Sequence, residues 1–393
     1  MLKVDEGKIK EVLERGVEEV FVKSELEKKL RSGERLRIKL GIDPTGPNIH
    51  IGRATALRKL RAFQDMGHKA VFIVGDFTAQ IGDASDKLSK RPMLTKKDIK
   101  KNLKDYKKQI GKIIDLRKAE FHFNSKWLSK LRFDDVALLA ETFSVQQMLN
   151  RRNFSDRMEK QEEISLREFL YPLMQGYDSF AVKADFEIGG FDQLFNLKAG
   201  RIIQKHFGQK EQDIMTLQML EGTDGRKMST SWGNIITIVD EPSDMFGKVM
   251  TIRDELITKY FLLCTDYSRE KISEIEDAIK NGQNPKNFKM ELAKEIVRIY
   301  HGQKEAEKAE GFFVKTFEKK EIPDEVEEIS FGEDKVADRL IKEKIVSSRT
   351  ELIRLIKDGA ITNLDKDKKV EREDDLKERG TYRIGKHRFI KVN

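Results

Sequence analysis

The segment from Leu36 to Met66 constrains the fold more than any other part of this 393-residue chain. Leu36–Ile42 alternates apolar residues in a β-rich composition and predicts a strand, which the turn-forming residues at 43–48 bring to an end. Ala54–Met66 then repeats apolar residues at helical spacing. Gly52 would therefore lie at a helix N-terminus, where free backbone N–H groups and the helix dipole favour an anion. A strand, a tight turn and a helix together predict one βα unit of a parallel sheet.

Two short segments predict a site for the triphosphate of ATP. The first, His50–Arg53, reads His-Ile-Gly-Arg. Gly52 lets a nucleotide lie close to the backbone, and His50 can donate a hydrogen bond to the charge that develops during attack on the α-phosphate. Taken alone, this tetrapeptide also fits a plain strand–turn–helix. The second segment, Lys227–Ser231, reads Lys-Met-Ser-Thr-Ser and predicts a mobile cationic loop that would face the phosphates.

The composition limits the class of protein. A hydrophobic content of 38% and a charged content of 37% are typical of a soluble protein. The one cysteine, Cys264, excludes an internal disulfide framework and a cysteine zinc knuckle, and it suits a reducing cytoplasm. The six histidines show no metal-ligand spacing, so no metal site is expected. Met1–Glu34 has helical spacing without the apolar core of a signal peptide, and no stretch of about 18 apolar residues predicts a membrane span.

The order of the predicted elements indicates an α/β fold with a Rossmann-like parallel sheet. Strands are expected at 36–42, 70–74, 185–188 and 214–220, and helices at 54–66 and 193–207. The N-terminal segment before the first strand is expected to be helical. The predicted domains are a catalytic domain at 1–235 with a helical insertion at about 97–180, an α-helical domain at 236–325, and a small α+β domain at 335–393. A linker is expected at Ile322–Asp324.

Positive charge is concentrated at the C-terminus. Residues 335–393 hold 17 Lys and Arg against 11 Asp and Glu, which places +6 of the total net charge of +8 in this segment. Binding to a phosphate backbone is one use of such a patch, and a solvated charged surface is the other. The same two interpretations apply to the lysines at 96–108.

One helical face carries three polar groups. Tyr171, Gln175 and Asp178 lie at positions i, i+4 and i+7, so a helix would present them together. Such a face suits a small ligand with an amino group at one end and a hydroxyl at the other. A half-buried helix with exposed polar residues is the alternative. Asp192, after a glycine-rich turn, could accept hydrogen bonds from a ribose, and Asp83 could hold an α-ammonium group.

With these motifs the chain resembles the tyrosyl-tRNA synthetases, which are class I aminoacyl-tRNA synthetases. It is most similar to the bacterial subgroup with Lys rather than Tyr just before Gly-x-Asp-Pro-Thr, and the resemblance runs from about Val17 to the C-terminus. Val346–Asn363 resembles the helix–turn–strand core of the ribosomal-protein S-four type of RNA-binding module. The resemblance implies a cytoplasmic tyrosine–tRNA ligase that uses ATP, Mg²⁺, L-tyrosine and tRNA(Tyr). It also implies a homodimer formed through the 120–180 insertion.

The resemblance assigns roles residue by residue, with Asp178 as the acceptor of the phenol hydroxyl and Asp192 as a ribose ligand. The residues implied in catalysis are His50, Arg53, Lys87, Arg91, Lys227 and Thr230. Those implied in tyrosine binding are Lys39, Asp83, Tyr171, Gln175, Asp178 and Gln193. Those implied in binding ATP and the adenylate are Gly41, Asp43, Thr45, His50, Gly52, Thr78, Gly190, Asp192, Lys227, Met228 and Ser229. Those implied in RNA binding are Arg349, Arg354 and Lys357.

Three residues depart from the usual family pattern. Arg53 replaces the second histidine of His-x-Gly-His, and Thr230 replaces the second lysine of Lys-Met-Ser-Lys-Ser. Lys39 stands where many members have a phenol-binding tyrosine, so Asp178 would act alone or beside an ammonium. Two rival interpretations follow: a tryptophanyl-tRNA synthetase, or a non-catalytic RNA-binding protein derived from a synthetase.

Overall fold

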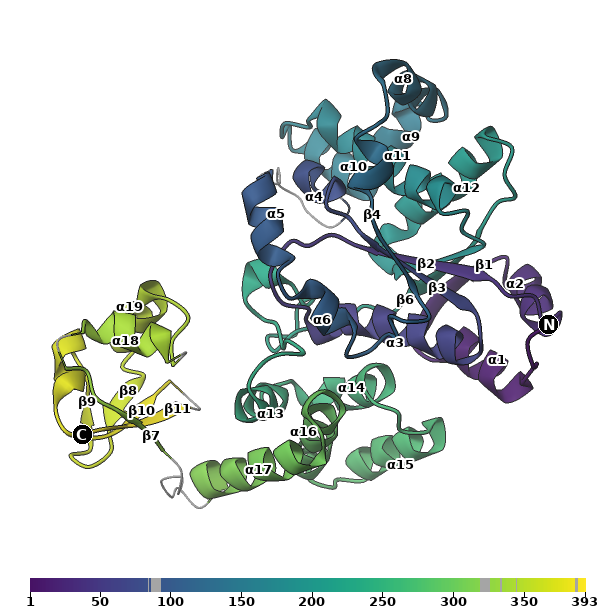
Figure 1. The fold of residues 1–393 in the computed structure, drawn as a ribbon. Helices are drawn as coiled ribbons and strands as arrows, with labels where there is room; N and C mark the ends of the chain where they lie inside the picture. The colour runs from purple at the N-terminus through teal and green to yellow at the C-terminus, as the bar shows by residue number, and fades with distance from the viewer. Residues whose placement is uncertain (84, 86–92, 319–325, 333, 344, 386–387) are drawn as a thin grey trace. The chain divides into compact units, whose positions relative to one another are not determined.

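The computed structural model describes residues 1–83, 85, 93–318, 326–332, 334–343, 345–385 and 388–393. The chain forms two compact units, each with its own sheet (Figure 1). Unit 1 comprises Met1–Val239 and Ile252–Phe288, and unit 2 comprises Asp240–Thr251 and Lys289–Asn393. The division into three domains, with limits at 235 and 335, stays a prediction, and the predicted linker at Ile322–Asp324 lies outside the described residues.

The elements alternate between strands and helices in the N-terminal part and are mostly helical after it. The strands are β1 (Val17–Phe21), β2 (Arg37–Ile42), β3 (Lys69–Val74), β4 (Glu120–Phe123), β5 (Phe186–Gly190), β6 (Asp213–Leu217), β7 (Glu327–Ile329), β8 (Ile361–Asn363), β9 (Lys368–Lys369), β10 (Gly380–Ile384) and β11 (Arg388–Val392). The helices up to the end of the insertion are α1 (Glu6–Glu14), α2 (Lys23–Arg31), α3 (Ile51–Asp65), α4 (Thr78–Ile81), α5 (Lys96–Asn102), α6 (Tyr106–Ile110), α7 (Ser125–Leu128), α8 (Phe133–Glu141), α9 (Val145–Leu149), α10 (Arg152–Glu159) and α11 (Leu166–Ala181). The later helices are α12 (Leu194–His206), α13 (Pro242–Met250), α14 (Ile257–Cys264), α15 (Arg269–Lys280), α16 (Pro285–His301), α17 (Gln303–Phe313), α18 (Val336–Lys342) and α19 (Arg349–Lys357).

The sheet of unit 1 has the strand order β1-β6-β5-β2-β3-β4. The pairs β2/β3, β2/β5, β3/β4 and β5/β6 are all parallel. The chain builds the sheet in one direction from β2 to β4 and in the other from β2 to β5 and β6, so the strand order reverses between β2 and β5. In an open α/β sheet, ligands bind at the carboxyl ends of the strands beside such a reversal.

Two strands differ from the sequence-based expectation. The N-terminal segment is not entirely helical, because β1 pairs antiparallel with β6 and forms the edge of the sheet. Gly16 ends the preceding helix with a φ of +62°, a conformation that glycine adopts without strain. Strand β1, with five residues, is too short to change the helical periodicity of the flanking sequence. The largely helical insertion likewise contributes the edge strand β4.

Helices cover both faces of this sheet. Helix α3 packs on β2, β3 and β5, while α12 packs on β5 and β6 and also along α11. Figure 1 shows α3 on one side of the sheet and α11 with α12 on the other. The rings of Phe63 and Phe186 meet edge to face at 5.3 Å within the fully buried core. The predicted Rossmann-like α/β fold is confirmed.

The C-terminal part of unit 2 holds a sheet in the order β7-β11-β10-β8-β9. The helix–turn–strand predicted around Val346–Asn363 is present as α19, a turn at Gly359 with a φ of +61°, and β8. Strand β7 pairs with β11, so the small sheet begins upstream of residue 335. Among the described residues no helix combines the length and the apolar character needed to cross a membrane.

Candidate active site

A cavity of about 460 Å³ opens at the carboxyl ends of β2 and β5. This volume lies in the range of ligand sites. The structure brings the predicted site residues of unit 1 together around it, with two exceptions. The predicted residues that line the cavity are Lys39, Gly41, Asp43, Thr45, His50, Gly52, Arg53, Thr78, Asp83, Tyr171, Gln175, Asp178, Gly190, Asp192, Gln193, Lys227, Met228, Ser229 and Thr230. The exceptions, Lys87 and Arg91, lie outside the described residues.

Asp43 anchors the turn that follows β2. Its carboxylate accepts hydrogen bonds from the Tyr171 hydroxyl at 3.0 Å and from the Thr78 hydroxyl at 2.7 Å. Burial, followed by the charges of Asp43 and Asp83, raises the pKa of Tyr171 well above its usual value, so this phenol stays protonated and donates. A Cβ atom on Gly75 would lie 1.9 Å from Asp43 Oδ1. Glycine at 75 therefore leaves room for the carboxylate that ties α11 to the first βα turn.

Arg53 holds the same turn from the helix side. Its guanidinium donates to the Thr45 hydroxyl at 2.7 Å and to the Asp43 carbonyl at 3.2 Å. A weaker bond of 3.4 Å runs to the hydroxyl of buried Tyr106. In this arrangement Arg53 fixes the loop that faces the nucleotide site, which is a supporting task in addition to the catalytic role implied by the resemblance.

His50 is the N-cap of α3. Its Nδ1 accepts a hydrogen bond from the backbone N–H of Arg53 at 3.3 Å. Burial, with the nearby charges of Arg53 and Lys227, lowers the pKa of His50 to about 3. The ring is therefore neutral near pH 7, and because Nδ1 accepts, its proton lies on Nε2. His50 thus offers a neutral donor beside the N-terminus of α3.

Asp178 is a fully buried carboxyl group with two side-chain donors. It accepts from Trp127 Nε1 at 2.7 Å and from Asn124 Nδ2 at 3.2 Å. Burial raises its pKa to about 7, against the lowering effects of Lys39, Trp127 and Asn124. Trp127 and Asn124 were not predicted from the sequence. Both residues follow β4, an edge strand within the segment expected to be helical, so the sequence pattern did not place them at the carboxyl edge of the sheet.

Lys39 is a buried residue whose ammonium group is occupied by protein acceptors. It donates to the Gln175 carbonyl at 2.9 Å and to the Ser179 hydroxyl at 2.8 Å, and it pairs with Glu187 at 2.8 Å. An ammonium has three donor positions, so these contacts use all of them. Lys39 therefore acts on Asp178 through its charge and by supporting α11, and a direct bond to a bound phenol would require it to leave one of these partners.

A second carboxylate lies at the other end of the polar face of α11. Asp83 accepts from Gln193 Nε2 at 2.7 Å and from the Ser85 hydroxyl at 2.7 Å. Gln193 is held in turn by Asn196, whose amide donates to it at 2.9 Å. Asp83 is thereby fixed with its negative charge beside the cavity.

The Lys-Met-Ser segment closes over the nucleotide side of the cavity. Lys227 Nζ pairs with Asp192 Oδ2 at 2.9 Å, and Met228 is buried, with its sulfur facing Gly52 at the start of α3. Thr230 lies against the turn at Gly46. The two segments singled out in the sequence thus meet. In the described part of the chain no group of three His, Cys, Asp or Glu residues is arranged to hold a metal ion.

Comparison with known proteins places this site in a family. Residues 31–318 match the family of tRNA synthetases class I (W and Y). The chain therefore belongs to the class I tRNA synthetases of the tryptophan and tyrosine type. The tyrosine–tRNA ligase of Thermotoga maritima is 45% identical over 97% of this chain and 96% of its own length, and that of Carboxydothermus hydrogenoformans is 44% identical over 97% of both. At this similarity over nearly the whole chain, it belongs to the tyrosine–tRNA ligases within that family.

Solved structures share the fold. A tyrosyl-tRNA synthetase of Archaeoglobus fulgidus, complexed with L-tyrosine, has a TM-score of 0.61 and 22% identity, covering 78% of this chain and 99% of its own. A C-terminally truncated mitochondrial tyrosyl-tRNA synthetase of Aspergillus nidulans has a TM-score of 0.64 and 22% identity, covering 79% and 94%.

Proposed function

We propose that the chain activates L-tyrosine with ATP and transfers it to the 3′ end of tRNA(Tyr). The observation that carries this proposal is the buried carboxyl group of Asp178, held by Trp127 and Asn124. A buried acceptor of this kind favours a ligand with a hydroxyl over the same ligand without one, because an unpaired buried carboxylate is costly. Tyrosyl-tRNA synthetases are the general example of such discrimination.

The amino-acid end of tyrosine is assigned to the polar face of α11 and its neighbours. Asp83 supplies a negative charge for the α-ammonium group, and the Tyr171 and Gln175 side chains supply oxygen acceptors beside it. Asp83 and Asp178 both line the cavity, so one is assigned to the ammonium end of the ligand and the other to its phenol. Gln193 contributes by holding Asp83.

Adenylate formation is an in-line displacement at the α-phosphorus. A carboxylate oxygen of tyrosine attacks, the bond to the bridging oxygen breaks, and pyrophosphate leaves with the electron pair. His50 donates through Nε2, the N-terminus of α3 supplies backbone N–H groups, and Lys227 adds a positive charge to the leaving phosphates. ATP enters with Mg²⁺ as its counter-ion. Asp192 and Gly190 are assigned to the ribose, and Lys227 leaves its ion pair with Asp192 when it reaches the leaving phosphates.

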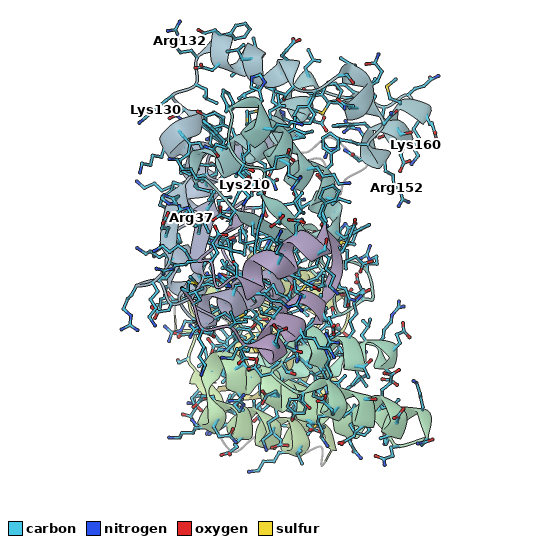
Figure 2. The ribbon with its side chains drawn as sticks, turned by 90° about the vertical axis from the view of Figure 1, so that its right-hand side faces the viewer. Arg37, Lys130, Arg132, Arg152, Lys160 and Lys210 are labelled. Atoms are coloured by element: carbon cyan, nitrogen blue, oxygen red, sulfur yellow. The ribbon has the colours of Figure 1, made fainter. Side chains whose placement is uncertain are left out.

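Binding of tRNA is assigned to exposed cations of the C-terminal module and of the helical insertion. Arg349, Arg354 and Lys357 are exposed on α19, within the helix–turn–strand of the C-terminal module. Figure 2 shows Lys130 and Arg132 on one side of the insertion and Arg152 and Lys160 on the other. These cations would neutralise RNA phosphates, and recognition by shape and phosphate contacts is typical of such modules.

A homodimer through the insertion is supported by its exposed apolar side chains. Phe133, Leu138, Val145, Met158 and Leu166 all lie exposed on α8–α11. Exposed apolar side chains that gather in one patch mark an interface between proteins, and we infer that these five do so. We expect sedimentation to give a dimer, and Leu166→Asp to shift it toward monomer. A cytoplasmic location is supported by the single buried cysteine and by the substrates, which belong to protein synthesis.

The test is ATP–pyrophosphate exchange with each of the twenty amino acids. We expect exchange with tyrosine alone. Preference for tryptophan would assign the chain to the other branch of its family. Absence of exchange, with retained RNA binding, would favour the non-catalytic alternative.

A further inference from the structure

The Lys-Met-Ser segment, Lys227–Ser231, directly continues a tight hairpin. Glu221 and Lys227 face each other as an antiparallel pair, and the Gly222 backbone N–H donates to the Arg226 carbonyl at 2.7 Å. Gly225 turns the hairpin with a φ of +80°. The hairpin therefore fixes the backbone on the N-terminal side of Lys227. On the C-terminal side, the backbone position depends on the contacts of the residues that follow.

Asn234 holds those residues. Its side chain is only 4% exposed, and its Oδ1 accepts from the backbone N–H of Ser229 at 2.9 Å. Its Nδ2 donates to the Lys227 carbonyl at 3.0 Å and to Asp224 Oδ1 at 2.7 Å. One amide thus bonds to the loop on both sides of Met228 and to the turn of the hairpin.

Asp224 is the fixed partner of this amide. It also accepts from the Arg226 backbone and guanidinium, and its own carbonyl accepts from Arg253 at 3.0 Å. At the base of the hairpin, Tyr260 and Lys259 of α14 bond to Glu221. The hairpin is therefore anchored to α14 independently of Asn234, so removal of the amide should release the loop without unfolding its support.

We propose that Asn234 is a positioning residue for tyrosine activation, acting through the loop residues Lys227 and Met228. This inference rests on the proposed function. Asn234 sets the backbone from which the Lys227 ammonium reaches Asp192 and, with nucleotide bound, the leaving phosphates. Asn234 also keeps the Met228 side chain packed against Gly52 at the start of α3. Misplacement of such a charge by about 1 Å can slow a reaction by about a hundredfold.

The primary experiment compares Asn234→Asp with the parent in tyrosine-dependent pyrophosphate exchange. The substitution keeps the size of the side chain and the acceptor for Ser229, but it turns an oxygen toward Asp224 and the Lys227 carbonyl. We expect the rate at saturating substrates to fall at least about tenfold, while the dissociation constant of tyrosine changes by less than about twofold. The double variant Asn234→Asp/Asp224→Asn exchanges the amide and the carboxylate. It should restore part of the rate, because an amide donor then faces a carboxylate acceptor again. Asn234→Ala repeats the test without a buried charge.

Double-mutant cycles separate positioning from simple structural damage. In a Lys227→Ala background, Asn234→Asp should slow exchange by a clearly smaller factor than in the parent, since one of the two side chains that it positions is absent. In an Asp178→Asn background, Asn234→Asp should slow exchange by the same factor as in the parent. An equal cost in all three backgrounds, an unchanged rate, or a matching loss of tyrosine binding would each overturn the inference while leaving the proposed function intact. A parent without tyrosine-dependent exchange would refute the proposed function and this inference with it.

Discussion

Tyrosine binding should depend on pH through Asp178. In the folded chain burial raises the pKa of this carboxyl group to about 7, whereas an exposed aspartate has a pKa near 3.8. Between pH 6 and pH 8 the group therefore loses its proton in the folded state, having already lost it in the unfolded state. Its contribution to stability is therefore lost as the pH rises from about 3.8 to about 7. Tyrosine affinity should move in the opposite direction, because the ionised carboxylate is the better acceptor for a phenol.

The size of the effect follows from the ionised fraction. With a pKa near 7, roughly 10% of the Asp178 side chains are ionised at pH 6 and roughly 90% at pH 8. If only the ionised form accepts the phenol hydroxyl, the dissociation constant of tyrosine should fall about tenfold over this range. A hydrogen bond to a charged group contributes about 1.5–3 kcal/mol, so Asp178→Asn should also weaken tyrosine binding by roughly 10- to 100-fold.

Isothermal titration with tyrosine at pH 6, 7 and 8 measures this dependence. Phenylalanine, which lacks the hydroxyl, is the ligand control, and Asp178→Asn is the protein control. Both should show little change with pH. A pH dependence that survives in Asp178→Asn, or that phenylalanine shows equally, would refute the assignment of Asp178 as the phenol acceptor.

Three further changes test separate parts of the site. Thr230→Lys should accelerate adenylate formation with unchanged tyrosine affinity in pre-steady-state assays, because a second cation would stabilise the leaving pyrophosphate only as charge develops. Thr230→Gln controls for size and should be no faster than the parent. A truncated chain lacking Val326–Asn393 should keep pyrophosphate exchange and lose tRNA charging, with a flatter salt dependence of tRNA binding; parallel loss of both activities would contradict the assignment of this module. Gly75→Ala should lower the melting temperature and slow exchange, since its Cβ would displace the Asp43 carboxylate, and a variant with parental values of both would contradict that constraint.

The fold was predictable where the sequence carries strong periodicity and turn residues. The strand at Arg37–Ile42, the helix that follows it and the polar face of α11 all lie where the pattern placed them. Strand β1 was not predicted, because an edge strand of five residues gains its stability from pairing with β6, a contact distant in sequence. The same holds for β4, which carries Asn124 and Trp127 to the site.

The network around the site was predictable only in part. Motif residues identify the groups that face a ligand, but their protein partners depend on contacts between distant segments. Lys39 illustrates this, because its pairing with Glu187 and Ser179 arises when β2, β5 and α11 come together. Arg53 likewise appears in the sequence as a substitution in a motif, and in the structure as a support for Thr45.

Charging of tRNA with tyrosine is the complete reaction expected of this chain. The chain is incubated with ATP, Mg²⁺, an equimolar mixture of the twenty amino acids and total bacterial tRNA, and the esterified amino acid and its tRNA are identified by mass spectrometry. We expect tyrosine on tRNA(Tyr), and its loss with Lys227→Ala. Tryptophan on its tRNA, phenylalanine in amounts comparable to tyrosine, or no charged tRNA would contradict it.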